Sequence, residues 1–454
     1  MNIRCIVRSI LVALASATCL SPTCACGAGG GNAKTDCQWY RHDALARELS
    51  QLTEREVAKF TASDLIDIRP VVVPRHENVV GPNDYFMWPI ATKVNDTLVV
   101  LYARSPCHWG KDKSKRDGNA GIRMVVTSSD GGKTWTEPVD VLRAGRWTNS
   151  PFKGFGGGLG VREGVAYLAI NQGVYRSRDK GRSWELVSAS PSFEGVPGRL
   201  WAPGMRLTFD TEHGMTIWTT AGYASVRKEI GDYGNRLCAV YSRDEGRTWR
   251  YQEQALPEGI GLSEVTPVQF DGKIAFLLRN GLKEVRYAQA YSKTGWFPFR
   301  FGVSNIGPVE IVDTPDIAYN PATRRLEAAV SHRKGGGPGP KGPMKVNLYS
   351  IATSEMAAGR THWRFEGTLI RYRAAFGTSD GFNPVGSVID RQAGRQYIYV
   401  WGGNCTGRAA IFQVSRSLDT PAVRDYLVKF YETEGPPCPS AALLQIAPQA
   451  HDQR

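Results

Sequence analysis

The segment "SSDGGKTW" (Ser128–Trp135) returns twice without a gap, as "SRDKGRSW" (177–184) and "SRDEGRTW" (242–249). We call these segments octets one, two and three; they share the pattern Ser-x-Asp-x-Gly-x-Ser/Thr-Trp. The Asp side chain can accept hydrogen bonds from nearby backbone N–H groups, the Gly supplies positive φ, and the Trp enters the next strand as a packing anchor. Because each octet follows an apolar, strand-like run, each predicts a β-hairpin with a self-capped turn.

The spacing of the octets indicates a repeat architecture. Their aspartates, Asp130, Asp179 and Asp244, are 49 and 65 residues apart, near the period of about 40–50 residues of four-stranded propeller blades. Six segments repeat a polar or acidic entry, a strand, a turn and a second strand. Their entries are "NDYFMWPIATKV", "FKGFGGGLGV", "RLWAPGMRLTF", "LSEVTPVQF", "IVDTPDIAY" and "DGFNPVGSVI". "YSKTGW" and "YSIATSEMAAGRTHW" resemble decayed octets in the fourth and fifth segments. We therefore expect an all-β, six-bladed β-propeller.

The chain of 454 residues divides into four expected parts. Residues 1–26 have a basic start, an apolar stretch and small residues before Cys26, typical of a secretory signal peptide. Residues 27–76 hold an amphipathic pattern that predicts a short helical segment, and then "IDIRPVVVPR", a strand that could close the ring by pairing with C-terminal strands. The propeller is expected over 77–434, with a tail over 435–454.

Charge and cysteine content limit the partners and the compartment. The net charge of +13 is spread along the chain, which favours an acidic partner such as a polyanionic glycan over DNA, although a solvated basic surface explains it equally well. We expect no nucleic acid, no transmembrane segment, no metal and no cofactor, and a secreted or periplasmic monomer. A lipoprotein cysteine at Cys19 or Cys26 is the alternative. Five cysteines follow the signal segment, and this odd number implies either at least one free thiol or a different cleavage point.

The octets resemble the Asp-box, or BNR, repeats of the sialidase superfamily of β-propellers. In that family the repeats lie at blade edges, away from the site, and they also occur in non-enzymatic propellers and in lyases. The resemblance therefore implies the fold more strongly than the chemistry. Asp130, Asp179 and Asp244 are expected to be structural, since the turn already accounts for them.

Strand topology predicts where charged residues gather. The starts of first strands and the ends of second strands share one face of a propeller, because the two strands are antiparallel. This rule collects arginines with carboxylates, a plausible pocket for an anionic sugar. The residues are Arg104, Arg279 and Arg333 with Asp84, Glu264, Asp313, Asp316 and Asp380.

The fourth segment carries the most detailed resemblance. "SEVTPVQFDGKIAFLLRN" is similar to the sialidase segment in which a Glu assists the nucleophile and a later Arg grips the substrate carboxylate. The resemblance gives these roles to Glu264 and Arg279. The alternative is that Arg279 only pairs with Glu264 at the rim.

Two departures from the family pattern affect the chemistry. "MWPI" replaces the family's Arg-Ile-Pro, so Met87 and Trp88 stand where an arginine is expected, and Arg104 is the compensating candidate. Trp88 is also a candidate for stacking on a sugar ring, and the alternative is that it only packs in the core. The family's acid/base Asp falls in "PCHWGKDKSKRDG", which offers Asp112, Asp117 and His108.

The second departure concerns the nucleophile. The late Tyr of sialidases is replaced by Phe382, with Asp380 nearby. Unless Tyr372 or Tyr319 substitutes, a pair of carboxylates would have to act as acid and base. The pattern favours a glycoside hydrolase acting on an acidic sugar. A carbohydrate-binding propeller and a polysaccharide lyase are the alternatives.

Overall fold

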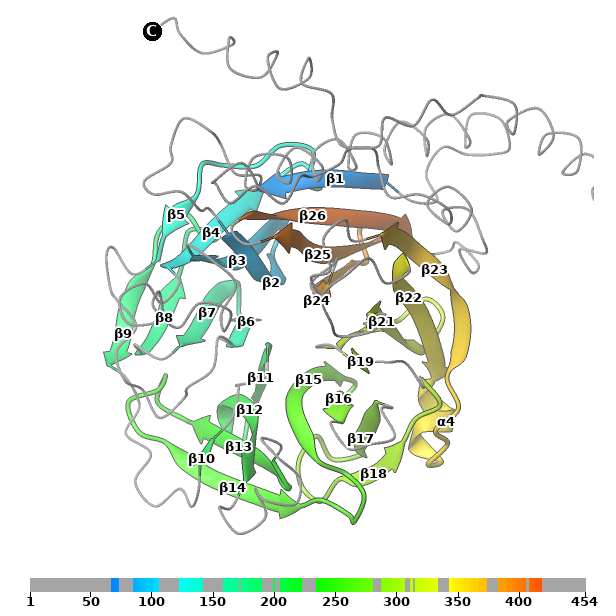
Figure 1. Cartoon of the computed structure of the whole chain (residues 1–454). Helices are drawn as coiled ribbons and strands as arrows, with labels where there is room; N and C mark the ends of the chain where they lie inside the picture. Colours follow the sequence, from blue (N-terminus) through cyan, green and yellow to red (C-terminus); the bar gives the residue numbers. More distant parts are fainter. Residues whose placement is uncertain are drawn as a thin grey trace, which may run out of the picture. The chain divides into compact units, whose positions relative to one another are not determined.

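The described part of the chain is built of short antiparallel sheets arranged as six blades in a ring (Figure 1). The computed structural model describes residues 67–72, 85–105, 122–141, 158–170, 173–189, 199–200, 205–222, 234–280, 287–306, 311–312, 315–333, 343–373, 383–405 and 408–418. All of them belong to one unit, Thr35–Arg454. The expected signal peptide, N-terminal helical segment and C-terminal tail lie outside these residues.

The first three blades carry the octets and follow one another along the chain. Blade one contains β2 (Tyr85–Val94), β3 (Thr97–Ser105), β4 (Ile122–Ser128) and β5 (Val139–Asp140). Blade two contains β6 (Gly158–Arg162), β7 (Val165–Ile170), β8 (Gly173–Ser177) and β9 (Glu185–Ala189). Blade three contains β11 (Leu207–Asp210), β12 (Gly214–Gly222), β13 (Arg236–Ser242) and β14 (Arg250–Ala255), with β10 (Arg199–Leu200) also paired to β12.

The remaining blades repeat this order. Blade four contains β15 (Leu262–Phe270), β16 (Lys273–Asn280), β17 (Ala288–Ser292) and β18 (Arg300–Val303). Blade five contains β20 (Asp316–Asn320), β21 (Arg325–Arg333), β22 (Pro343–Ala352) and β23 (Arg364–Arg373), with β19 (Ile311–Val312) paired to β21 and the short helix α4 (Thr353–Ala357) after β22. Blade six contains β24 (Asn383–Asp390), β25 (Arg395–Cys405), β26 (Arg408–Ser417) and β1 (Asp67–Val72).

Ring closure comes from the N-terminal side, as the sequence predicts. β1 pairs antiparallel with β26, with Asp67 opposite Ser415 and Pro70 opposite Phe412 (Figure 1). Proline is tolerated there because β1 is the edge strand of its sheet and the register shifts after Pro70. The sixth blade is therefore completed by a segment more than three hundred residues earlier in the chain.

The three octets form one hydrogen-bonded turn. In octet one, Ser128 donates to Asp130 at 2.7 Å, the Gly132 N–H donates to Ser128 at 2.8 Å, and both the backbone N–H and the hydroxyl of Thr134 donate to Asp130. The same four bonds recur in octets two and three. The conserved Gly has a φ of 85°, 89° and 88° in turn, so a side chain there would be strained.

The tryptophan that ends each octet packs onto the preceding blade. Trp135 makes an edge contact with Tyr399 of blade six, with ring centroids 6.1 Å apart. The decayed octets keep this feature: Trp296 stacks on His213 of blade three at 3.5 Å. Trp363 donates to Gln289 of blade four at 2.8 Å. The anchor thus fastens neighbouring blades together.

The pairing registers define two faces of the ring. Phe86 lies opposite Arg104 and Leu98 lies opposite Ser128, so the octet turn is at the other end of the blade from Arg104. We call the face with the octet turns the turn face. The face at which β2, β15, β20 and β24 begin, which also carries the end of β16, is the entry face.

Candidate functional site

The entry face of blade four brings together the two residues that the sequence singles out. Arg279 donates from Nη1 to Oε2 of Glu264 at 2.8 Å, between the second strand β16 and the inner strand β15. The side chains are 23% and 21% exposed, so the pair is half-buried and still open to solvent. A guanidinium has five N–H donors, so Arg279 can bind the carboxylate of Glu264 and an anionic ligand at the same time.

The inner strands are irregular at this face. Register shifts interrupt the pairing of β15 between Leu262 and Val265, where Glu264 lies. Matching shifts occur in β2 between Met87 and Ile90, and in β24 between Pro384 and Gly386. In a regular strand, alternate side chains point into the interface with a neighbouring blade, and a bulge changes the direction of one of them. Bulges are common beside active sites. Three of the six inner strands thus depart from regular pairing on the same face.

Trp88 occupies the bulge of β2 in a strained conformation. Its φ is 50°, in the left-handed region that a bulky residue rarely adopts. The half-buried ring packs against the core and makes an edge contact with Trp401, with centroids 5.9 Å apart. Trp88 therefore has a packing role, and its position at the entry face still permits the stacking role predicted from the sequence.

The other predicted ligand-binding residues come from different blades. Arg104 is half-buried near the end of β3 in blade one, the blade opposite blade four in the ring. Arg333 ends β21 in blade five, opposite Ile311. Asp84, Asp112, Asp313 and Asp380 lie outside the described residues, as do Asp117, His108 and Phe382. Their roles remain predictions.

Two residues that the sequence offers for chemistry are already engaged elsewhere. The Asp316 side chain is 1% exposed and is bonded by Arg206 and Ser387, so it cannot exchange protons with a substrate in this arrangement. Tyr319 lies near the turn-face end of β20, where its hydroxyl donates to Asp271 at 3.4 Å and its ring stacks on Phe270. Tyr319 therefore does not replace the missing nucleophile beside Glu264.

Arg206 is the residue that sequence reasoning missed. It precedes β11 in blade three, and its Nη2 atom lies 2.7 Å from Asp316 Oδ1 in blade five. The same guanidinium donates to the carbonyl oxygens of Ile317 and Ser387. Arginines at second-strand ends are the signal that the sequence offers for the channel, whereas Arg206 in "GMRLTF" stands just before a first strand.

A cavity of about 370 Å³ extends along the channel from Arg206 toward the turn face. Its walls are the distal parts of the inner strands, including Lys93, Gln269 and Tyr319. Gln269 bridges blades by exchanging hydrogen bonds with the backbone of Phe209. No cluster of potential metal ligands occurs among the residues that the structure describes. No described helix has the length and apolar character needed to cross a bilayer.

Comparisons with known proteins agree with the architecture. No protein-family model and no curated protein matches the chain. A protein of unknown function from Dyadobacter fermentans is similar in structure, with a TM-score of 0.54 and 17% identity over 77% of this chain and 99% of that one. A K499G mutant of NanB sialidase from Streptococcus pneumoniae has a TM-score of 0.51 and 12% identity, over 81% of this chain and 72% of that one.

These similarities place the chain in a structural class. The protein is a six-bladed β-propeller, a fold that it shares with the NanB sialidase. At 12–17% identity the likeness concerns the fold alone, and what the entry face does must be argued from its own residues.

Proposed function

We propose that the protein is a sialidase-like glycoside hydrolase that acts on an acidic sugar at the entry face. The observation that carries the proposal is the ion pair between Arg279 and Glu264, which is half-buried near the irregular start of the inner strand β15. Arg279 is suited to bind the carboxylate of the substrate bidentately. Glu264 is suited to transfer a proton or to steer the group that does so.

The substrate is expected to be an acidic sugar other than ordinary N-acetylneuraminic acid. Sialidases use a clamp of three arginines, and here Met87 and Trp88 occupy the place of one of them. Losing one bidentate charged contact costs about 2–5 kcal/mol, or roughly thirty-fold to several thousand-fold in affinity. Arg104 and Arg333 approach from other blades, so a ligand that they hold would sit differently against Glu264. A related keto-acid or a uronate fits these constraints better.

The attacking group is expected to be a carboxylate. Phe382 replaces the family tyrosine, and Tyr319 points to the turn face. Asp380 and Asp112 are the candidates to act with Glu264 as acid and base. Export to the periplasm or the exterior, predicted from residues 1–26, suits an enzyme for extracellular glycans.

A carbohydrate-binding propeller without turnover is the second candidate, favoured by Phe382 in place of the family tyrosine and by Met87 and Trp88 in place of an arginine. A panel of acidic glycosides with chromogenic or fluorogenic leaving groups separates the two. Release that is lost in Glu264→Ala supports the hydrolase. Binding on a glycan array without release from any acidic glycoside supports the binder, and an unsaturated product that absorbs in the ultraviolet indicates a lyase. Efficient release of 4-methylumbelliferone from its N-acetylneuraminic acid conjugate, lost in Arg279→Ala, would contradict the substrate assignment.

A further inference from the structure

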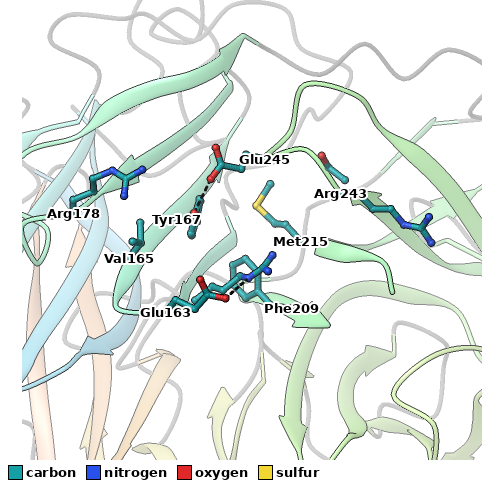
Figure 2. A pocket seen from close by; sticks show the side chains of 10 residues that line it. Glu163, Val165, Tyr167, Arg178, Phe209, Met215, Arg243 and Glu245 are labelled. Carbon is teal, nitrogen blue, oxygen red and sulfur yellow. Dashed lines mark hydrogen bonds and ion pairs between the residues drawn. The ribbon is translucent and has the colours of Figure 1, made fainter. Parts of the chain in front are cut away.

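A groove on the turn face lies between blades two and three, at the opposite end of the blades from Glu264 (Figure 2). It encloses about 390 Å³, within the range of about 300–1,000 Å³ typical of small-molecule sites. Octets two and three form part of its wall, through Arg178, Arg243 and Glu245. The proposed hydrolase activity does not involve this groove.

The floor of the groove is formed by rigid rings and apolar groups. Tyr167 and Phe209 pack at a centroid distance of 5.7 Å, and Met215 is buried beside them. Phe209 cannot retreat, because it fills the space over Gly160, where an added Cβ would come within 2.8 Å of its ring. Tyr167 is itself buried, so the half-buried Phe209 offers the ring surface on which a sugar can lie.

The acidic groups of the groove are mostly neutralised within the protein. Glu245 accepts hydrogen bonds from the Tyr167 hydroxyl and from Arg176, both at 2.9 Å. Glu163 pairs with Arg162 at 3.3 Å, but these side chains are 80% and 48% exposed, and such a pair contributes little. The carboxylates therefore do not repel an incoming anion strongly, and Arg162 can be recruited by a ligand.

Two arginines provide positive charge at the edges of the groove. Arg178 is 63% exposed and forms a long ion pair, with its Nε 3.6 Å from Oε1 of Glu185, a carboxylate that Arg176 also binds. Arg243 makes no ion pair with any residue that the structure describes. Figure 2 shows the two on opposite sides of the groove, with Tyr167, Glu245 and Met215 between them. Both occupy the second position of an octet, immediately before the Asp that fixes the turn.

Because Arg178 and Arg243 belong to hydrogen-bonded octet turns, their backbone positions are fixed. The second position of octet one is Ser129, so the turn itself does not require arginine. The two arginines appear only where an octet borders this groove. In the third octet Glu245 occupies the left-handed fourth position of the turn at φ 58°, as Lys180 does in octet two at φ 62°. From there its side chain reaches Tyr167 and Arg176 across the groove.

We propose that the groove is a second binding site, which takes an anionic sugar unit. The sugar ring lies against Phe209, its carboxylate or sulfate pairs with an arginine at the edge of the groove, Arg178 or Arg243, and its hydroxyls donate to Glu245. A site of this kind holds a polyanionic glycan on the face opposite the proposed hydrolytic site. It accounts for part of the +13 net charge of the chain.

The test is titration calorimetry of the purified full chain with three tetrasaccharides: tetragalacturonate, a sulfated heparin tetrasaccharide and neutral maltotetraose. Arg178→Ser with Arg243→Ser copies octet one and removes both groove arginines. Arg182→Ser with Arg247→Ser removes the same charge from exposed octet positions that do not line the groove. The first double variant is expected to lose at least about ten-fold in affinity for an anionic tetrasaccharide, and the second less than about two-fold.

Tighter binding of the galacturonate identifies a carboxylate site, and tighter binding of the heparin fragment a sulfate site. All titrations are repeated in a Glu264→Ala, Arg279→Ala background, which removes the entry-face ion pair, so that the affinity measured there belongs to the groove. The proposal is overturned if the two octet double variants lose affinity equally in that background, if maltotetraose binds as well as the anions, or if neither anion binds.

Discussion

Arg206 Nη2 lies 2.7 Å from Asp316 Oδ1, although the two residues belong to blades three and five. The Arg206 guanidinium also reaches the Ser387 carbonyl of blade six at 2.9 Å. One side chain therefore links three blades across the channel. The ion pair is almost fully buried, with side-chain exposures of 14% and 1%. It fixes the position of Asp316, the first residue of β20, which begins at the entry face.

Breaking this pair should destabilise the propeller. Asp316→Ala leaves a buried guanidinium without its counter-charge, and we expect the free energy of unfolding in urea to fall by about 3–5 kcal/mol. Asp96→Ala breaks the exposed pair with Lys180, whose side chains are 63% and 39% exposed, and should change the free energy of unfolding far less. Equal losses in the two variants would show that the channel pair is no more important than a surface pair.

The octet aspartates should matter for stability and not for chemistry. Asp179→Ala or Asp244→Ala removes the acceptor of three hydrogen bonds within the turn, and Asp130→Ala the acceptor of four. Each should lower the free energy of unfolding by about 1–3 kcal/mol and lower Tm, while kcat and KM of the folded protein stay nearly unchanged. A variant of normal Tm without turnover would mean that the turn face carries the chemistry.

The same aspartates predict a loss of stability in acid. Burial opposes ionisation of Asp130 and Asp244, but hydrogen bonds from the Thr and Ser of each octet outweigh it and lower both pKa values to about 2. Because the folded-state pKa is below the ordinary value of 3.8, this contribution is present above pH 3.8 and is lost as the pH falls toward 2. Between pH 5 and 2, the free energy of unfolding of Asp130→Asn should fall less steeply with falling pH than that of the unsubstituted protein. An unchanged slope would exclude Asp130 as a source of the acid sensitivity.

Most of the fold follows from local sequence signals. The octets encode their own hydrogen bonds, and strand alternation places Glu264 and Arg279 at one end of a blade, where the structure joins them. Contacts that depend on the closed ring could not be predicted. Arg206 reaches Asp316 only because the closed ring brings blades three and five, on either side of blade four, to the same channel. Nor does the octet pattern reveal that its fourth position is left-handed, with φ of 62° at Lys180, since two of three copies carry an ordinary residue there.

Closure of the ring by β1 gives a prediction of its own. A chain that starts at residue 61 keeps β1 (Asp67–Val72), whereas one that starts at residue 74 exposes the edge of β26. The shorter chain should have a lower Tm and should aggregate, because an uncovered strand edge invites pairing. A peptide of residues 61–76 added in trans should restore part of the lost Tm. Equal Tm values for the two chains would show that β1 is dispensable.

The central claim is that Glu264 and Arg279 act on an acidic sugar, and steady-state kinetics of Glu264→Gln on the best acidic glycoside of the panel test it most directly. The amide keeps the size of the side chain and its hydrogen-bonding oxygen but cannot carry the proton or the charge. We predict that kcat falls by about 10²–10⁴-fold with KM changed only a few-fold, while Arg279→Lys mainly raises KM. Wild-type kcat in Glu264→Gln, with Arg279→Lys equally active, would contradict the account and leave the ion pair a structural feature of the rim.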